Sequence, residues 1–179
     1  MRTVIEVATF VGPLSFVWDD DALGVDAEGR VIKGAVVRSE FVRAARLAGA
    51  GARVVDADSA SGDPGMVVQA VRAWSDGSAP NALDVVPVLQ AGGEFRQKCW
   101  QALRSVKAGE VLSYAELAQL AGNPLASRAA GSAMANNTVA PFVPCHRVVR
   151  ADGVIGNYSA TGGSETKVRI LEHEGNQIA

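Results

Sequence analysis

The stretch PFVPCHRVVR, residues 141–150, places one of the chain's two cysteines directly before one of its two histidines. A free cysteine has a pKa near about 8.5 and is mostly protonated at neutral pH, so a nucleophilic cysteine needs a base or a positive field. His146 is the obvious base for Cys145. Taken alone, such a pair is more often a buried structural cysteine beside a core histidine. Here it lies between a predicted helix-turn-helix and the Gly-rich stretch ADGVIGNYSATGG, and this context favours nucleophilic cysteine chemistry.

The geometry of this pair can be anticipated from its neighbours. Two prolines and several apolar residues predict an extended segment. Neighbouring side chains of an extended chain point to opposite faces, so we expect a water to bridge Cys145 and His146. By triad logic His146 also needs an orienting carboxylate. Glu172, in a predicted C-terminal helix, is one candidate, and the residues leave Glu174 and Asp152 open.

Two predicted helices precede the cysteine. The first, over residues 113–122, opens with Ser113 and Glu116 at the spacing of a capping box. The second follows a short turn, with Asn123 as its cap and Pro124 at its first helical position. Two helices joined by a short turn form a helix-turn-helix.

The second of these helices carries a single long charged side chain, Arg128, among very small ones. One interpretation is a helix packed tightly against a core, with Arg128 reaching to water. The other is a helix slim enough to lie deep in a DNA groove, with the arginine reaching in. The helix alone does not decide between them.

The segment before the helix-turn-helix predicts a further helix. EFRQKCWQALRSVKAGE, residues 94–110, places Phe95, Cys99, Leu103 and Val106 on one face. Cys99 is therefore interpreted as a small core residue. Residues 1–85 instead show the alternating apolar and polar pattern of short strands, with a predicted hairpin that turns at Glu28–Gly29 and one later helix. This pattern is typical of a small α+β domain.

Composition narrows the class of protein. The chain has 179 residues, of which 48% are hydrophobic and 20% charged, enough to build a core. Two cysteines and two histidines favour neither a disulfide framework nor a metal site. Residues 1–93 carry 12 acidic and 8 basic side chains, whereas residues 94–179 carry 7 and 9, so the second half is the better candidate for contact with phosphates. With neither a signal-peptide pattern nor an apolar run of membrane-spanning length, we expect a cytoplasmic protein without membrane partners.

Several motifs together resemble a known family. PCHRVV, preceded by the Arg128 helix and Asn137 and followed by GVIGNYS, is similar to the O6-alkylguanine–DNA alkyltransferases. The similarity spans roughly residues 86–175 and includes EFRQKCWQAL and GEVLSYAELAQLAG in the family's order. With the pattern above it implies an α+β fold. A small N-terminal α/β domain with a short sheet (1–85) and a connector (86–93) would precede a mainly helical, winged-helix-like domain (94–179) that holds the helix-turn-helix and the active-site cysteine.

The resemblance implies a repair protein that acts once. It would bind duplex DNA in the minor groove and flip O6-alkylguanine, with O4-alkylthymine as a second candidate lesion, out of the stack. Cys145 would accept the alkyl group, His146 would take the thiol proton through a water, and Glu172 would hold His146. Tyr114 would hydrogen-bond the flipped base and Asn137 would organise the active-site turn. No cofactor is implied.

The remaining residues carried over from the family form two groups. The pocket wall and rim would consist of Met134, Val148, Tyr158 and Ser159. Arg128 would fill the space left by the flipped base, and small residues would permit close approach to DNA: Ala126, Ser127, Ala129 and Gly131. We expect a monomer in solution and leave cooperative binding on DNA open.

Three other functions share some of these sequence features. A lesion sensor without the nucleophile is disfavoured because Cys145 is present. A helix-turn-helix transcription regulator needs no Cys-His pair, and its recognition helix ordinarily carries more polar side chains. A cysteine hydrolase would use the same catalytic groups, but it would turn over many times.

Overall fold

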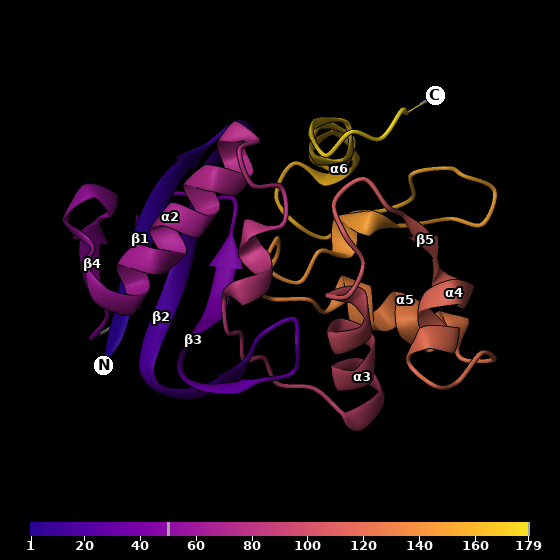
Figure 1. Cartoon of the computed structure of the whole chain (residues 1–179), viewed down its shortest axis with the longest axis horizontal. Helices are drawn as coiled ribbons and strands as arrows, with labels where there is room; N and C mark the ends of the chain where they lie inside the picture. Colours follow the sequence, from indigo (N-terminus) through magenta and orange to yellow (C-terminus); the bar gives the residue numbers. More distant parts are fainter. Residues whose placement is uncertain (50, 179) are drawn as a thin grey trace. The chain divides into compact units, whose positions relative to one another are not determined.

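The computed structural model describes residues 1–49 and 51–178 and divides into two compact units, Met1–Gln90 and Ala91–Ala179 (Figure 1). The division falls inside the predicted connector, residues 86–93. The first residues of that connector belong to the first unit, because Val88 forms isolated β-bridges with Val25 and Val36.

A four-stranded sheet forms the body of the first unit, with the strand order β3-β2-β1-β4. Strand β1 pairs antiparallel with β2 and parallel with β4, and β2 pairs antiparallel with β3. The strands are β1 (Arg2–Thr9), β2 (Gly12–Val25), β3 (Val31–Glu40) and β4 (Arg53–Asp56). The predicted hairpin turn at Glu28–Gly29 is confirmed between β2 and β3, where the buried Asp26 side chain accepts from the backbone N–H groups of Glu28 and Arg30.

Helices cover both faces of this sheet. Helix α2 (Gly62–Asp76) crosses one face (Figure 1), and the ring of Trp74 lies 5.2 Å from that of Phe10 at the end of the β1–β2 hairpin. The short helix α1 (Ala44–Leu47) packs on the opposite face, where Val4 and Val17 share a small core with it. The short 3₁₀ turns η1 (Ala57–Ser59) and η2 (Ala82–Val85) complete the unit.

The second unit is mainly helical, as predicted. Its elements in chain order are α3 (Glu94–Leu103), β5 (Leu112–Ser113), α4 (Tyr114–Leu120), α5 (Ser127–Ala135), the 3₁₀ turn η3 (Cys145–Arg147), β6 (Val148–Val149) and α6 (Gly163–His173). Cys99 is fully buried on α3, as expected for a core residue. The indole Nε1 of Trp100 donates to the carbonyl of Ala133 at 2.9 Å, which ties α3 to α5.

The helix-turn-helix consists of α4 and α5. The predicted capping box is confirmed: the Ser113 side chain accepts from the Glu116 backbone, and the Glu116 carboxylate accepts from the Ser113 backbone at 2.6 Å. The predicted start of the second helix is wrong, because α5 begins at Ser127 rather than Pro124. The Asn123 side chain accepts from the backbone N–H of Leu125, so it closes a turn between the helices instead of capping the second one.

The segment around the cysteine differs from the extended chain that we predicted. Cys145–Arg147 is a 3₁₀ turn, and the backbone before it is folded back by a hydrogen bond from the Val143 N–H to the Val139 carbonyl. The chain is extended only at β6, which pairs in parallel with β5. The pairing places the start of α4 beside the segment that follows Cys145, so a contact between residues far apart in the sequence helps to shape the chain around the cysteine.

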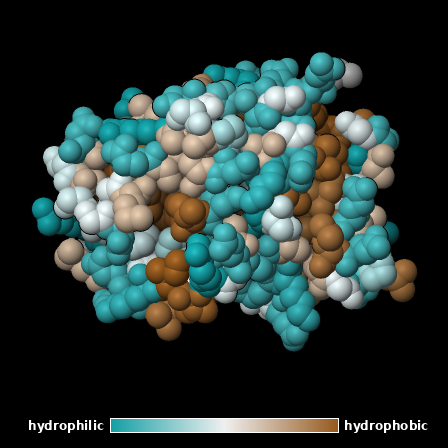
Figure 2. All heavy atoms as spheres, in the orientation of Figure 1, coloured by the Kyte–Doolittle hydropathy of each residue, from teal (hydrophilic) through white to brown (hydrophobic). Residues whose placement is uncertain are grey.

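The surface is largely hydrophilic on the face that Figure 2 shows, with hydrophobic groups in separate patches. Within residues 1–49 and 51–178, none of the helices has the length and apolar character needed to cross a membrane.

Candidate active site

A cavity of about 320 Å³ opens over Cys145. Its lining comes from both helices of the helix-turn-helix, from η3 and from the loop before α6. The lining residues are Tyr114, Gly131, Met134, Ala135, Cys145, Asn157, Tyr158 and Ser159. The predicted pocket residues Met134, Tyr158 and Ser159 are therefore among them, whereas Val148 is fully buried in β6 and is not part of the lining.

The Cys145 thiol is buried at this cavity, and burial raises its pKa above the ordinary value of a cysteine. A hydrogen bond from the Asn137 side chain and the positive charge of Lys167 act in the opposite direction, but burial has the larger effect. The resting protein therefore holds Cys145 as a thiol at neutral pH. Its proton must leave when the sulfur reacts, so a base must be in reach of the site.

The carboxylate that contacts His146 is that of Glu174, not Glu172. Glu174 Oε1 lies 3.0 Å from His146 Nε2, and both side chains are fully buried. Our assignment of Glu172 to this role is wrong because the Glu172 side chain is exposed on the other side of the helix. Glu174, the C-cap residue of α6, continues a face formed by Lys167, Ile170 and Leu171 at helical spacing. This helical spacing is the sequence feature that identifies Glu174 as the buried carboxylate.

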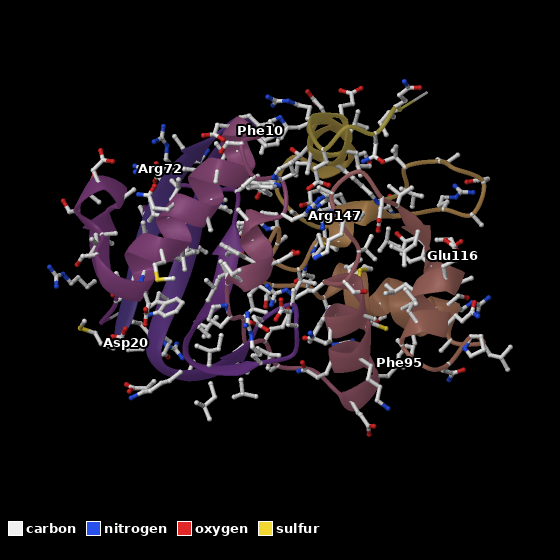
Figure 3. The ribbon with its side chains drawn as sticks, viewed as in Figure 1. Phe10, Asp20, Arg72, Phe95, Glu116 and Arg147 are labelled. Carbon is white, nitrogen blue, oxygen red and sulfur yellow. The ribbon has the colours of Figure 1, made fainter. Side chains whose placement is uncertain are left out.

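Arg147 completes the carboxylate's environment. Its Nε donates to Glu174 Oε2 at 3.0 Å and its Nη2 to Oε1 at 2.8 Å, while Nη1 donates to the Val106 carbonyl at 2.7 Å. Figure 3 shows Arg147 in the second unit, close to α6. Together, Arg147 and His146 hold the pKa of Glu174 well below its ordinary range despite burial. Glu174 is thus ionised at neutral pH, and its contact with His146 holds the histidine ring in position.

This contact defines the protonation of His146. Burial lowers the pKa of His146, so the ring is neutral at neutral pH. Because Glu174 is an anion, the single ring proton lies on Nε2 and is donated to the carboxylate. Nδ1 is then an acceptor, and within the described residues it is buried without a hydrogen-bond partner. The histidine accordingly presents a basic nitrogen that no protein group occupies.

Asn137 holds the turn that carries the cysteine. Its Nδ2 donates to the Val143 carbonyl at 2.8 Å, and its Oδ1 accepts from the Val139 N–H at 3.2 Å. These bonds close the chain before Cys145 into a defined turn, and the same side chain also hydrogen-bonds the thiol. The contacts place Asn137 in this turn, and the organising role that the resemblance implied stays a prediction.

Lys167 is a site residue that the sequence analysis missed. The side chain is almost completely buried, and its Nζ donates to the carbonyls of Val148 at 2.7 Å and Asn157 at 3.2 Å. Burial lowers the pKa of Lys167 to about 8, against the opposing influence of Cys145. The lysine joins the strand after the cysteine to the pocket loop and places a cation near the sulfur. Its register with Ile170 and Leu171 on α6 is a sequence feature that indicates burial.

Tyr114 and Gly131 are neighbours in the cavity lining. A Cβ added at Gly131 would lie 3.7 Å from the Tyr114 ring, so the glycine leaves open the space beside the tyrosine. Burial, and secondarily Cys145, raise the pKa of Tyr114. Its hydroxyl therefore remains a hydrogen-bond donor at neutral pH.

The predicted DNA-contacting residues lie at the start of α5. Arg128 and Ala129 are exposed, while Ala126, Ser127 and Gly131 are partly exposed. Ala130, Ala133 and Met134 form the buried side of the helix. One side of α5 thus packs on a core, and the other presents an arginine among small residues; its contact with DNA stays a prediction.

No cluster of three or more His, Cys, Asp or Glu side chains suited to a metal ion occurs within the part of the chain that the structure describes.

Comparison with known proteins gives a consistent result. Residues 94–176 match the family described as 6-O-methylguanine DNA methyltransferase, DNA binding domain. The methylated-DNA–protein-cysteine methyltransferase of Rattus norvegicus is 54% identical over 89 residues, which cover 50% of this chain and 42% of the rat protein. That of Shigella flexneri is 34% identical over 113 residues, which cover 63% of this chain and 64% of that protein.

The fold comparison extends over more of the chain. The crystal structure of the Mycobacterium tuberculosis O6-methylguanine methyltransferase superimposes with a TM-score of 0.69 at 26% identity, covering 97% of this chain and 93% of that one. The sequence matches to mammalian relatives span less than half of those proteins' length. Residues 94–176 thus match the DNA-binding domain of the O6-methylguanine DNA methyltransferases, and over this stretch the chain is similar to the methylated-DNA–protein-cysteine methyltransferases.

Proposed function

We propose that this protein removes alkyl groups from the O6 atom of guanine in duplex DNA and retains them on Cys145, one group per molecule. One observation carries the proposal: a buried cysteine, with a histidine–glutamate pair next to it in the chain, faces a cavity that both helices of a helix-turn-helix line. A pocket in that position suits a base that has left the DNA stack, and the matched relatives are named for this methyl transfer.

The proposed reaction is a displacement at the alkyl carbon. The thiol proton passes to Nδ1 of His146 through a bridging water, and the sulfur attacks the carbon. The S–C bond forms while the C–O6 bond breaks, and its electron pair remains on the guanine. The imidazolium that forms is stabilised by the Glu174 anion, which takes the role that we had assigned to Glu172. The product is a thioether, which nothing in the site hydrolyses, so the protein acts once.

Tyr114 would assist the leaving guanine. Its hydroxyl belongs to the cavity wall, and the raised pKa keeps it protonated. A donor in this position can stabilise the negative charge that develops on the base as the C–O6 bond breaks.

DNA recognition is assigned to α5. Its exposed small residues would lie against the minor groove, and Arg128 would enter the space that the flipped base leaves. Minor-groove proteins commonly combine such basic side chains with close approach of the backbone. Flipping costs a few kcal/mol, and a weakly paired lesion lowers this cost, which favours damaged over normal guanine.

The wider proposal is a monomeric protein that needs no cofactor, because Cys145 is itself the second substrate. O4-alkylthymine is a candidate second lesion of similar shape, and cooperative binding along DNA stays open. A reactive thiol that must stay reduced fits the cytoplasm.

The test is intact-protein mass spectrometry after incubation with a duplex that contains one O6-methylguanine, followed by peptide mapping. We expect one added methyl group on the peptide that contains Cys145, and none in the Cys145→Ala variant. Cys99→Ala is the matched control, because Cys99 is also buried and should not accept the group. Binding of the lesion duplex without a mass change would point to a lesion sensor and refute the transfer.

A further inference from the structure

Arg150 borders Gly156, a glycine that the Tyr114 hydroxyl also borders. A Cβ added at Gly156 would lie 3.4 Å from Cγ of Arg150 and 3.8 Å from Oη of Tyr114, so both side chains border the same glycine. Gly156 has a φ of +74°, a conformation that favours glycine. The next residue, Asn157, lines the cavity. An arginine side chain is therefore located where the chain enters the cavity wall.

The loop that carries Arg150 has a defined shape. The Arg150 N–H donates to the Val154 carbonyl at 3.0 Å, and the Gly153 N–H donates to the Arg150 carbonyl at 2.9 Å. The Asp152 side chain accepts from the Val154 N–H at 3.1 Å, which closes the turn further. The backbone of Arg150 is thus held in place, and its side chain is directed by a fixed turn.

The guanidinium of Arg150 is available for another partner. Its Nη2 donates to Asp152 Oδ2 at 3.0 Å, and the two side chains are 58% and 51% exposed. Exposed ion pairs contribute little to stability because water screens them. A phosphate can compete with such a carboxylate, since an arginine fork binds both groups through the same two-pronged geometry.

From this geometry, and resting on the proposed function, we propose that Arg150 binds a backbone phosphate next to the nucleotide whose base enters the cavity. When a base rotates out of the stack, its sugar and flanking phosphates remain at the mouth of the pocket. A cation beside Tyr114 then holds the backbone while the tyrosine contacts the base. Asp152 occupies the guanidinium in the free protein and is displaced when DNA binds. Arg150 is a positioning residue, because it touches the substrate's backbone and not the reacting atoms.

The first test is the salt dependence of binding to a lesion-free duplex, which needs no alkyl transfer. Loss of one phosphate contact should lower the slope of log K against log salt by about 0.9. We expect this decrease and about tenfold weaker binding in Arg150→Ala, the scale of one charge-assisted hydrogen bond. Arg72→Ala is the matched control, because Arg72 is an exposed arginine paired with Asp58 in the first unit (Figure 3). Equal slopes for Arg150→Ala and the wild type would overturn the inference.

The second test separates the backbone contact from the chemistry. Methyl transfer to Cys145 is measured with the lesion duplex and with free O6-methylguanine base, which carries no phosphate. Arg150→Ala should react about tenfold more slowly with subsaturating duplex and at the wild-type rate with the free base. Asp152→Asn should change duplex binding in the opposite direction, because it releases the guanidinium. Equal losses on both substrates would contradict the phosphate contact, whereas failure of the wild type to transfer would refute the proposed function and leave the salt slope to decide the contact.

Discussion

Replacing Glu174 by glutamine should damage both stability and reactivity, because one carboxylate serves two buried groups. Glu174 accepts from His146 at 3.0 Å and from two nitrogens of Arg147 at 2.8 and 3.0 Å. Glutamine has nearly the same shape but no charge. The substitution therefore leaves the Arg147 guanidinium buried without a counter-ion, and His146 without the anion that stabilises its protonated form.

The structure sets the magnitude. Removal of one partner from a buried ion pair costs about 3–5 kcal/mol. Arg147 retains the Val106 carbonyl, and the glutamine oxygen can still accept one bond, so we expect the lower end, about 3 kcal/mol. Methyl transfer should slow by roughly 10²- to 10⁴-fold, the range for loss of an effective general base.

The effect should depend on pH in a defined direction. The folded protein lowers the pKa of Glu174, so the carboxylate's contribution to stability is complete above the ordinary pKa of a glutamate. That contribution is lost as the pH falls through the lower pKa of the folded state. The difference in unfolding free energy between wild type and Glu174→Gln should therefore be largest near neutral pH and shrink in acid.

The assay is urea unfolding followed by far-UV circular dichroism, together with the rate of methyl transfer to Cys145. The midpoint for Glu174→Gln should fall by roughly 1 M or more at an unchanged slope. Glu172→Gln is the control, since Glu172 is exposed two residues away and should change stability by less than about 0.5 kcal/mol. Similar losses in the two variants, or normal transfer by Glu174→Gln, would refute the reasoning.

Two further substitutions test the surroundings of the thiol. Lys167→Met removes a cation that lowers the pKa of Cys145, so alkylation of Cys145 by iodoacetamide should shift to higher pH; an unchanged profile would exclude this influence. Asn137→Ala leaves the Val143 carbonyl and the Val139 N–H without their side-chain partner and should lower the unfolding free energy by about 1–3 kcal/mol, measured in urea, with slower methyl transfer. Wild-type stability in this variant would show that the turn closes without the side chain.

Local patterns predicted much of the fold. The capping box at Ser113 and the buried pair Cys99 and Leu103 of α3 depend on residues three or four positions apart, and the structure confirms them. Helix α3 ends at Leu103, however, so the predicted continuation of its apolar face to Val106 is wrong. The hairpin turn at Glu28–Gly29 is equally local. Side chains and backbone groups within one or two turns of chain determine these features, so the sequence contains the relevant partners.

The predictions were wrong where a hydrogen-bond partner distant in the sequence, or a backbone group, determines the local conformation. The Cys145 segment folds into a 3₁₀ turn because Asn137 and the β5–β6 pairing hold it, and neither contact is visible in the order of its residues. Pro124 does not begin α5, because the Asn123 side chain accepts from the Leu125 N–H and closes a turn before the helix. In each case a plausible local preference lost to a competing hydrogen bond.

The kinds of side chain at the candidate site were predicted more completely than the residues that supply them. Cys145, His146 and Tyr114 were recognised by their chemistry and by family motifs, whereas the carboxylate was misplaced by two residues. Helical register would have corrected this, because Lys167, Ile170, Leu171 and Glu174 share the buried face of α6. The burial of Lys167 was harder to foresee, since its partners are the carbonyls of Val148 and Asn157, which any residue could supply.

The most direct test of the central claim is the number of methyl groups that each protein molecule removes when lesion duplex is in large excess. The loss of O6-methylguanine is followed to completion, and S-methylcysteine at Cys145 is quantified in the same sample. If Cys145 accepts one alkyl group per molecule, the loss of lesion reaches a plateau at one lesion repaired per protein, equal to the amount of methylated Cys145. Continued loss of lesion beyond one equivalent, with Cys145 unmodified, would contradict the account and indicate a hydrolase that turns over.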